Sequence, residues 1–180
     1  MSKPNLQAIT RELFSTPQTQ AFALLDGASV PGLLEALAQH AVTPVCLQRG
    51  SPAPDLAAVL PYLVEVPQES ALLAWLVAEV WGRHGVLFVV SAADRRTLCR
   101  HFRSLLLVKT PAGKQVFFRF YDPRVLRVYL PTCTPAEEGT VYGPVLRYAL
   151  EAEDPGTLLV FTAGRPAPRS VALPTVRSDA

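Results

Sequence analysis

The sequence predicts an α/β fold with three layers: a mixed, mainly parallel sheet, helices on both faces and a C-terminal β-hairpin. In the first half of the chain, strand-type segments alternate with helix-type segments, which is typical of parallel sheets. The run GVLFVVS, from Gly85 to Ser91, is almost continuously apolar, as in a central strand that is covered on both faces. Two later hairpin patterns make the predicted sheet mixed rather than purely parallel.

The first 48 residues predict, in order, a helix, a strand, a second helix and a second strand. Asn5 to Phe14 has the apolar spacing of a short amphipathic helix. QAFALL, from Gln20 to Leu25, reads as a strand that stops at an Asp-Gly turn. Val30 to His40 has helical spacing, and Pro31 suits the first turn of that helix. Val42 to Gln48 is then expected to form the second strand.

The next stretch leads to the expected centre of the sheet. Arg49 to Pro61 is a Pro-rich connection with room for one helical turn, and Tyr62 to Val66 is a short strand between prolines. Ser70 to Trp81 is the most apolar helical segment, with Glu79 as its only charge. Because a bilayer-spanning helix needs about 20 residues, we expect a helix that is buried on most sides. The central strand, Gly85 to Ser91, follows.

The third quarter predicts a basic helix, a hairpin and a second helix. Asp94 to Leu105 is amphipathic, and its basic residues are Arg95, Arg96, Arg100 and Arg103. Leu106 to Thr110 and Gln115 to Tyr121 flank the turn sequence PAGK and read as a hairpin. Asp122 stands at an N-cap position, and the helix from Pro123 to Leu130 follows with an apolar stripe.

The last fifty residues predict one more hairpin and a tail. Thr132 to Pro144 has no clear period and is expected to be irregular. Arg147 to Glu151 and Thr157 to Thr162 flank the turn Asp-Pro-Gly and form the C-terminal hairpin. Residues 164–180 are Pro-rich without a period, so we expect a flexible tail after a single domain of residues 1–163.

Composition excludes several classes of protein. With 49% hydrophobic and 18% charged residues in 180, the chain is too apolar to be disordered as a whole. The net charge of +2 comes from scattered basic residues, which does not favour nucleic acid as a partner. The N-terminus lacks the apolar stretch of a secretory signal, so neither export nor a membrane is expected. Three widely spaced cysteines indicate a reduced, cytoplasmic protein: Cys46, Cys99 and Cys133.

No motif for catalysis, cofactor binding or metal binding stands out. Ser91 follows a strand, but VVSAAD is not the G-x-S-x-G elbow of a hydrolase. Asp26 ends a strand, but LLDGAS has no phosphate-loop lysine, and no G-x-G-x-x-G follows any strand. The histidines and cysteines lack metal-ligand spacing. One alternative stays open: a small α/β enzyme that uses Asp26, Ser91 and Asp122 at strand ends, where open sheets bind ligands. A structural subunit of a larger assembly is another.

The best-defined local feature is the block QVFFRFYDPRVLRVYLP, residues 115–131. A strand with alternating residues passes directly into a helix through Asp122 and Pro123. Arg119 and Tyr121 share one face of that strand. Arg119 either pairs with a neighbouring acid or carbonyl or contacts a partner, and the sequence leaves both possibilities open.

Four blocks of the chain carry a family resemblance: FALLDGA (22–28), PYLVEV (61–66), FRFYDPRVLRVYLP (118–131) and YGPV (142–145). With them the chain resembles the adaptor or chaperone domain of bacterial type VI secretion systems, a family known as a domain of unknown function. The family signature falls on Asp26, Pro61, Leu63, Arg119, Tyr121, Asp122, Pro123, Leu126, Gly143 and Pro144.

The resemblance implies a cytoplasmic bacterial protein without enzymatic activity or cofactor. Such a protein binds a toxic effector and loads it onto the VgrG spike, so its partners are the secreted effector and VgrG. Tyr, Trp and Arg often dominate protein interfaces. The candidate partner-binding residues are therefore Arg119, Tyr121, Asp122, Trp75 and Tyr142.

Overall fold

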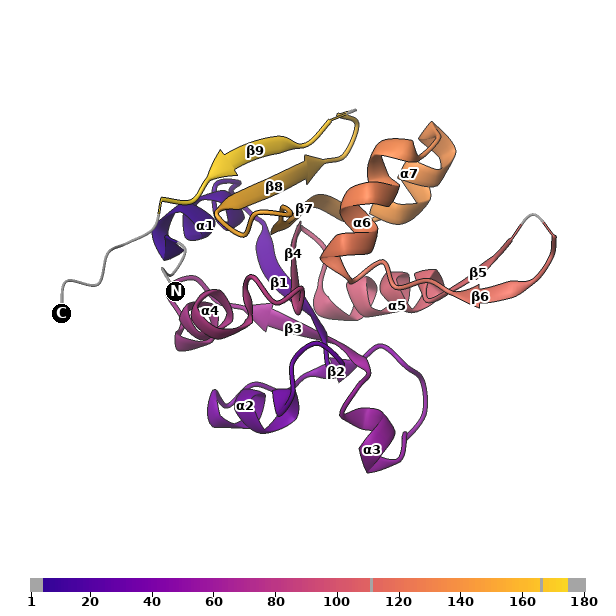
Figure 1. Cartoon of the computed structure of the whole chain (residues 1–180), viewed down its shortest axis with the longest axis horizontal. Coiled ribbons are helices and arrows are strands. Elements are labelled where there is room, and N and C mark those ends of the chain that lie inside the picture. Colours follow the sequence, from indigo (N-terminus) through magenta and orange to yellow (C-terminus); the bar gives the residue numbers. More distant parts are fainter. Residues whose placement is uncertain (1–4, 111, 166, 175–180) are drawn as a thin grey trace.

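The computed structural model describes residues 5–110, 112–165 and 167–174. Within these residues, seven strands form one sheet and two more form a separate hairpin (Figure 1). The strands of the large sheet, in spatial order, are β2 (Val45–Cys46), β3 (Pro61–Val66), β1 (Gln20–Asp26), β4 (Val86–Ser91), β7 (Val145–Glu151), β8 (Thr157–Thr162) and β9 (Arg169–Ala172).

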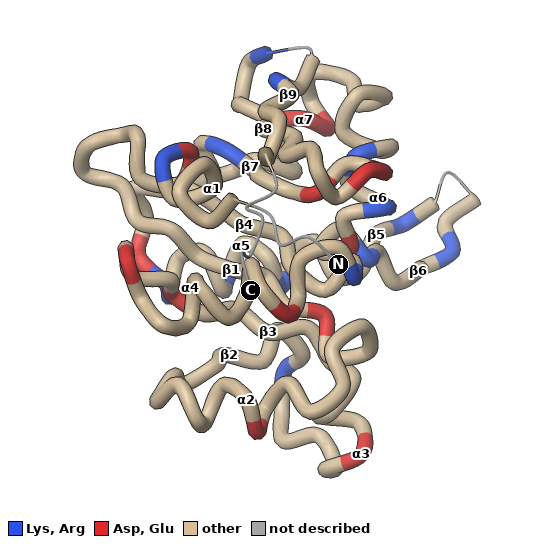
Figure 2. Tube along the Cα trace, turned by 60° about the vertical axis from the view of Figure 1, so that its left-hand side comes forward, with Lys and Arg blue, Asp and Glu red and all other residues tan. Residues whose placement is uncertain are grey.

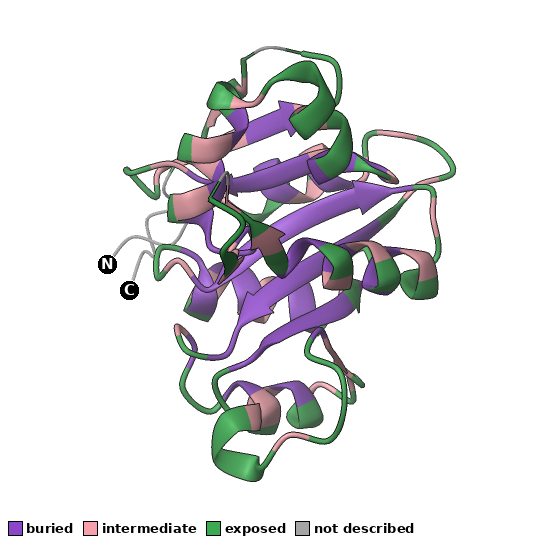
Figure 3. Cartoon of the chain, turned by 90° about the vertical axis from the view of Figure 1, so that its right-hand side faces the viewer, coloured by how far each residue is buried: buried purple, intermediate pink, exposed green. Residues whose placement is uncertain are grey.

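Helices cover both faces of this sheet, and each face has its own hydrophobic core. The first face carries α1 (Leu6–Leu13), α2 (Leu33–Gln39) and α4 (Ala71–Trp75), which continues as the π-helical turn η1 (Leu76–Val80). The second face carries α5 (Arg95–Leu105), α6 (Pro123–Tyr129) with its 3-10 extension η2 (Leu130–Thr132), and α7 (Pro135–Tyr142). The short α3 (Pro54–Ala57) has no buried residue. Figure 3 shows the buried strands between the half-exposed helices.

The prediction of a central, doubly covered strand is confirmed for β4. It is the fourth of the seven strands, and all six of its residues are buried. Alternate side chains serve the two cores, since Phe88 packs in the first and Leu87 and Val89 pack in the second. Apolar burial on both faces therefore accounts for the uninterrupted run in the sequence.

The mainly parallel sheet predicted from the sequence is wrong. Every pair of neighbouring strands in the described sheets is antiparallel. A parallel connection needs a helix that returns the chain along the full strand. The seven residues of α2 rise only about 10 Å, whereas the seven of β1 extend about 23 Å. Strands that run in the same direction, such as β3 and β4 on either side of β1, are next-nearest neighbours in the sheet and are not paired.

Two segment predictions are also corrected by the structure. Residues 132–144, expected to be irregular, contain α7, whose start is a capping box: Thr134 accepts the N–H of Glu137, and the Glu137 carboxylate accepts that of Thr134. The strand expected over 115–121 ends earlier, because β6 (Gln115–Phe117) pairs only with β5 (Leu107–Lys109). That hairpin does not join the large sheet.

The apolar segment 70–81 is helical, as predicted. Ser70 caps α4 by accepting the N–H of Leu73, and the N–H of Trp81 closes the π-turn on the carbonyl of Leu76. Leu72, Leu73 and Leu76 are buried in the first core. In the part of the chain that the structure describes, no helix combines the length and apolarity needed to cross a membrane.

The folded chain extends beyond residue 163, where the flexible tail was expected to begin. β9 pairs with β8 in antiparallel register, so part of the expected tail is an edge strand. Leu173 follows it with 3% of its surface exposed and packs in the first core. The strand was missed because its four residues are mostly polar or exposed and lack a period. Residues 175–180 lie outside the described part.

Leu173 provides a test of this strand. Leu173→Ala is expected to lower the free energy of unfolding by about 2–4 kcal/mol, because it removes a buried side chain and leaves a cavity. Urea denaturation followed by circular dichroism measures the change. Leu56→Ala is the control, because Leu56 is 50% exposed and its loss should cost no more than about 0.5 kcal/mol. Equal effects of the two substitutions would contradict the placement of Leu173 in the core.

Candidate functional site

The family-signature residues Asp26 and Arg119 form an ion pair at the end of β1, in which Asp26 is buried and Arg119 is partly exposed. Asp26 is fully buried, and its Oδ2 accepts hydrogen bonds from Nη2 of Arg119 at 2.5 Å and from Oγ of Ser29 at 2.8 Å. Its Oδ1 accepts the backbone N–H of Ala28 at 3.1 Å. The Asp-Gly turn expected after β1 is thus closed by the Asp26 side chain itself.

Asp122 forms the second carboxylate of the same cluster. It caps α6, as predicted, since its Oδ1 accepts the backbone N–H of Arg124 at 2.9 Å. The Arg124 side chain also donates to both carboxylate oxygens, at 3.0 and 2.8 Å. Nη2 of Arg119 lies 3.6 Å from Oδ2 of Asp122. Arg119 therefore stands between two acids that come from the end of β1 and the start of α6.

The charges of this cluster shift the pKa values of its members. Burial lowers the pKa of Arg119, but the charges of Asp26, Tyr121 and Asp122 outweigh it and raise the pKa overall. Burial, and then the charge of Asp26, raise the pKa of Tyr121 to about 12. Burial raises the pKa of Asp122, but the hydrogen bonds from Arg124 and the charges of Arg124 and Arg119 lower it overall. At neutral pH, Arg119 and Asp122 are charged and Tyr121 is neutral.

Asp26, Arg119, Asp122 and Arg124 together form a cluster of ion pairs that we call the clamp. Each carboxylate is held both by an arginine and by a backbone N–H, which satisfies a buried charge. A general acid or base works best with a pKa near the operating pH, and Asp122 and Tyr121 are shifted away from it in opposite directions. Of the two readings that the sequence left open for Arg119, the structure shows the ion pair.

The three strand-end residues of the alternative enzyme site do not come together. Because β4 runs antiparallel to β1, Ser91 pairs with Gln20, at the opposite end of β1 from Asp26. Six residues of strand separate those ends by about 20 Å. Ser91 is fully buried, and its hydroxyl donates to the carbonyl of Pro144 at 2.7 Å and accepts the N–H of Ala93. Asp26 and Asp122 share a site, and Ser91 does not belong to it.

The five candidate partner-binding residues do not share one surface. Trp75 is half-buried on the first face, where its ring centroid lies 5.5 Å from that of His40. Tyr142 is buried on the second face against Tyr148, and burial raises its pKa. Tyr121 and Asp122 are buried as well, with exposed fractions of 4% and 3%. Arg119 keeps 42% of its side chain exposed, so it is the accessible member of the clamp.

Other residues in the four blocks of the resemblance have structural explanations. A Cβ atom on Gly27 would lie 2.5 Å from the carbonyl oxygen of Ala58, so the turn after Asp26 has no room for a side chain. Gly143 has a φ of +49°, and a Cβ atom there would lie 2.5 Å from the ring of His101. Leu63 and Leu126 are fully buried in the second core. These positions hold the fold together.

No pattern in the sequence pointed to a third buried carboxylate, that of Glu151. Glu151 is fully buried at the end of β7, where it accepts the backbone N–H groups of Gly82 and His84 at 2.5 and 3.0 Å. The His84 ring contacts it too. Both residues have positive φ, which turns their N–H groups towards the carboxylate. No local spacing signals a contact between positions 67 and 69 residues apart.

The β5–β6 hairpin carries two exposed apolar residues close to the clamp in sequence. It projects from the body of the molecule beyond α5 (Figure 1). Leu107 and Phe117 lie directly opposite each other in the ladder and are 53% and 46% exposed. At its base, a hollow of about 210 Å³ lies between the hairpin, α6 and α7, and residues such as Val108, Phe118 and Tyr129 line it. The sequence predicted the hairpin but not its separation from the sheet.

Removing the Arg119 side chain should destabilise the folded chain, because the buried Asp26 carboxylate loses its counter-charge. Arg119→Met is expected to lower the free energy of unfolding by about 2–3 kcal/mol, since Asp26 keeps two other donors but loses its counter-charge. Arg124→Met, the comparison variant, should cost less than Arg119→Met, because Asp122 keeps the backbone N–H of residue 124 and has Arg119 as a second counter-charge at 3.6 Å. In the background of Asp26→Asn, Arg119→Met should cost less than in the wild type. An unchanged cost would refute the coupling.

Asp122 should make stability depend on pH. Its pKa is lowered in the folded chain, so its contribution is full above the ordinary value of 3.8 and is lost as the pH falls through the lowered value. Asp122→Asn keeps an N-capping side chain but removes the titrating group. Urea melts between about pH 6 and pH 2.5 should therefore show a shallower acid-side loss in Asp122→Asn than in the wild type. Parallel curves would contradict the assignment.

The described residues contain no group of three or more His, Cys, Asp or Glu side chains placed to hold a metal ion. Neither a curated protein nor a solved structure matches the chain. Residues 21–139 match the family described as "Domain of unknown function (DUF4123)". This match covers the clamp, the hairpin and most of α7, and ends shortly before the YGPV block. The chain belongs to the DUF4123 family.

Proposed function

We propose that this protein is an adaptor, or effector chaperone, that binds a toxic effector of a type VI secretion system in the bacterial cytoplasm and loads it onto the VgrG spike. The starting point is the resemblance carried by FALLDGA, PYLVEV, FRFYDPRVLRVYLP and YGPV. Family membership over residues 21–139 supports it, because three of the four blocks lie in that range.

The clamp is compatible with an adaptor because it is a structural device. Arg119 lies between the carboxylates of Asp26 and Asp122 and thereby links the end of β1 to the start of α6. Partner binding then depends on the surfaces that this arrangement presents. In this adaptor, the signature residues of the clamp hold the binding surface in place and do not contact the effector.

The observation that carries the proposal is the projecting β5–β6 hairpin. Its exposed cross-strand pair, Leu107 and Phe117, offers an apolar centre, and Lys109, Lys114 and Gln115 offer an exposed polar rim. Exposed apolar groups that are rimmed by polar ones mark contact sites. An isolated two-stranded hairpin also has free backbone edges, to which a partner strand can add.

Capture of partners from the native bacterium tests the proposal. Tagged wild-type chain should co-purify VgrG and one effector, identified by mass spectrometry. Phe117→Asp should reduce recovery of the effector by about tenfold or more, because it places a charge at the centre of the apolar contact. Leu56→Asp should leave recovery unchanged, since Leu56 is equally exposed but lies on α3, far from the hairpin (Figure 1).

The two parts of the proposal fail in different ways. Absence of both VgrG and an effector from the wild-type capture would overturn the adaptor function. Undiminished capture by a folded Phe117→Asp variant would overturn only the hairpin as the contact site. Circular dichroism of each variant distinguishes a lost contact from a lost fold.

A further inference from the structure

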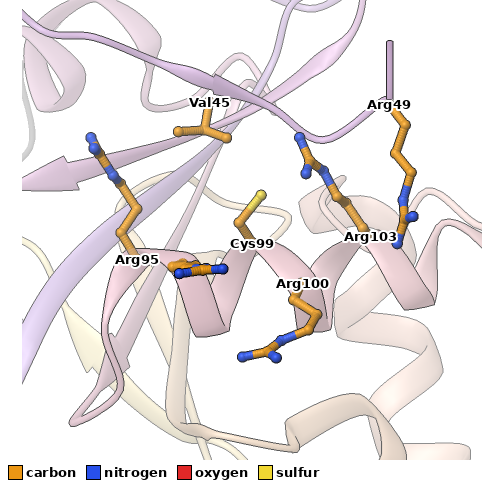
Figure 4. A pocket seen from close by; sticks show the side chains of 7 residues that line it. Val45, Arg49, Arg95, Cys99, Arg100 and Arg103 are labelled. Atoms are coloured by element: carbon orange, nitrogen blue, oxygen red, sulfur yellow. The ribbon is translucent and has the colours of Figure 1, made fainter.

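A hollow of about 500 Å³ lies between α5 and the segment around β2, and most of the residues that line it are arginines. Its lining consists of Arg49, Arg95, Arg96, Arg100 and Arg103 together with Val45 and Cys99. Five of the 17 basic residues of the chain thus gather at one place, although the net charge is only +2. Figure 4 shows their side chains around the hollow, and Figure 2 shows how lysines and arginines are spread over the rest of the chain.

One of these arginines has a structural role, and four do not. Arg103 donates to the carbonyl oxygens of Cys46 and Leu47, at 2.8 and 3.2 Å, and so fastens β2 and the residue after it to α5. The other four are exposed, and none of them hydrogen-bonds or ion-pairs with a described residue. They are Arg49, Arg95, Arg96 and Arg100.

The acidic side chain that interacts with the charges of Arg96 and Arg100 is that of Asp94, and it already accepts a hydrogen bond within α5. Asp94 caps α5 by accepting the N–H of Thr97 at 2.8 Å, and that contact with Thr97 lowers its pKa, helped by the charges of Arg96 and Arg100. Arg96 and Arg100 stand four residues apart on the helix, a spacing at which like charges repel. A bound anion would relieve this repulsion.

The hollow offers guanidinium groups and no reactive thiol. Burial raises the pKa of Cys99, although the charge of Arg103 opposes it, so the thiol stays protonated at neutral pH. Among the described residues, no aromatic side chain lines the hollow, and binding of single-stranded nucleic acid generally relies on aromatic rings that stack on bases. Guanidinium groups, in contrast, match carboxylates with paired hydrogen bonds.

We propose that this hollow binds an acidic segment of a partner protein, with several Asp or Glu side chains close together. From Arg95 to Arg103 the helix rises about 12 Å, which an extended peptide covers in about four residues. A segment of that length can bring two carboxylates to Arg95, Arg96 and Arg100 on one side of its backbone. The inference stands on the hollow itself and does not require the adaptor function.

A fluorescein-labelled peptide of about eight glutamates is the probe, and fluorescence anisotropy of the purified full chain measures its binding. The wild type should bind, and the affinity should fall as NaCl rises from about 50 to about 300 mM, because exposed charges are screened. Arg100→Glu should weaken binding by about tenfold or more. Arg11→Glu is the matched control: it changes the net charge equally on an exposed position of α1 and should have little effect.

Three results would overturn the proposal. The first is a wild type that does not bind the peptide at low salt. The second is equal weakening by Arg100→Glu and Arg11→Glu, which would indicate attraction by net charge alone. The third is tighter binding of a labelled single-stranded oligonucleotide than of the peptide, with the same dependence on Arg100, which would assign the hollow to nucleic acid. Thermal melts of both variants confirm that each is folded.

Discussion

The carboxylate of Asp26 is the constraint on which the second face of the molecule depends. An ionised carboxylate that is buried costs several kcal/mol unless a charge and hydrogen bonds compensate it. Local donors at Ala28 and Ser29 supply part of this compensation. The counter-charge comes from Arg119, 93 residues further along the chain. The carboxylate at the end of β1 is therefore compensated only when the segment that leads into α6 is in place.

The same segment organises both proposed binding surfaces. Arg119 follows β6 by two residues, and its neighbour Phe120 is fully buried and stacks on Phe102 of α5 at 5.6 Å. The N–H of Phe118 donates to the carbonyl of Leu106, which closes the base of the hairpin on the end of α5. The apolar hairpin and the arginine-lined hollow are therefore carried by elements that one buried segment holds in a fixed relation.

The sequence reveals the local features and leaves the long-range ones undetermined. Asp122 as an N-cap, the turn at Asp26 and the burial of β4 follow from residue type and periodicity. Strand direction does not, because a strand covered on both faces has the same apolar run in a parallel and an antiparallel sheet. The start of α7 was readable in the Thr-Pro-Ala-Glu capping box, whereas the Glu151 site depends on contacts that no local pattern encodes.

The arginine-lined hollow and the apolar hairpin would affect the binding of a partner in different ways. A charged hollow speeds encounter with an oppositely charged segment and loses strength in salt, whereas an apolar contact chiefly slows dissociation. A partner that has both an acidic segment and an apolar patch would be attracted by Arg95, Arg96 and Arg100 and retained by Leu107 and Phe117. Under the proposed adaptor function, transfer at the spike would begin when one of the two contacts is displaced. Two moderate contacts on one rigid frame permit capture and release more readily than a single tight one.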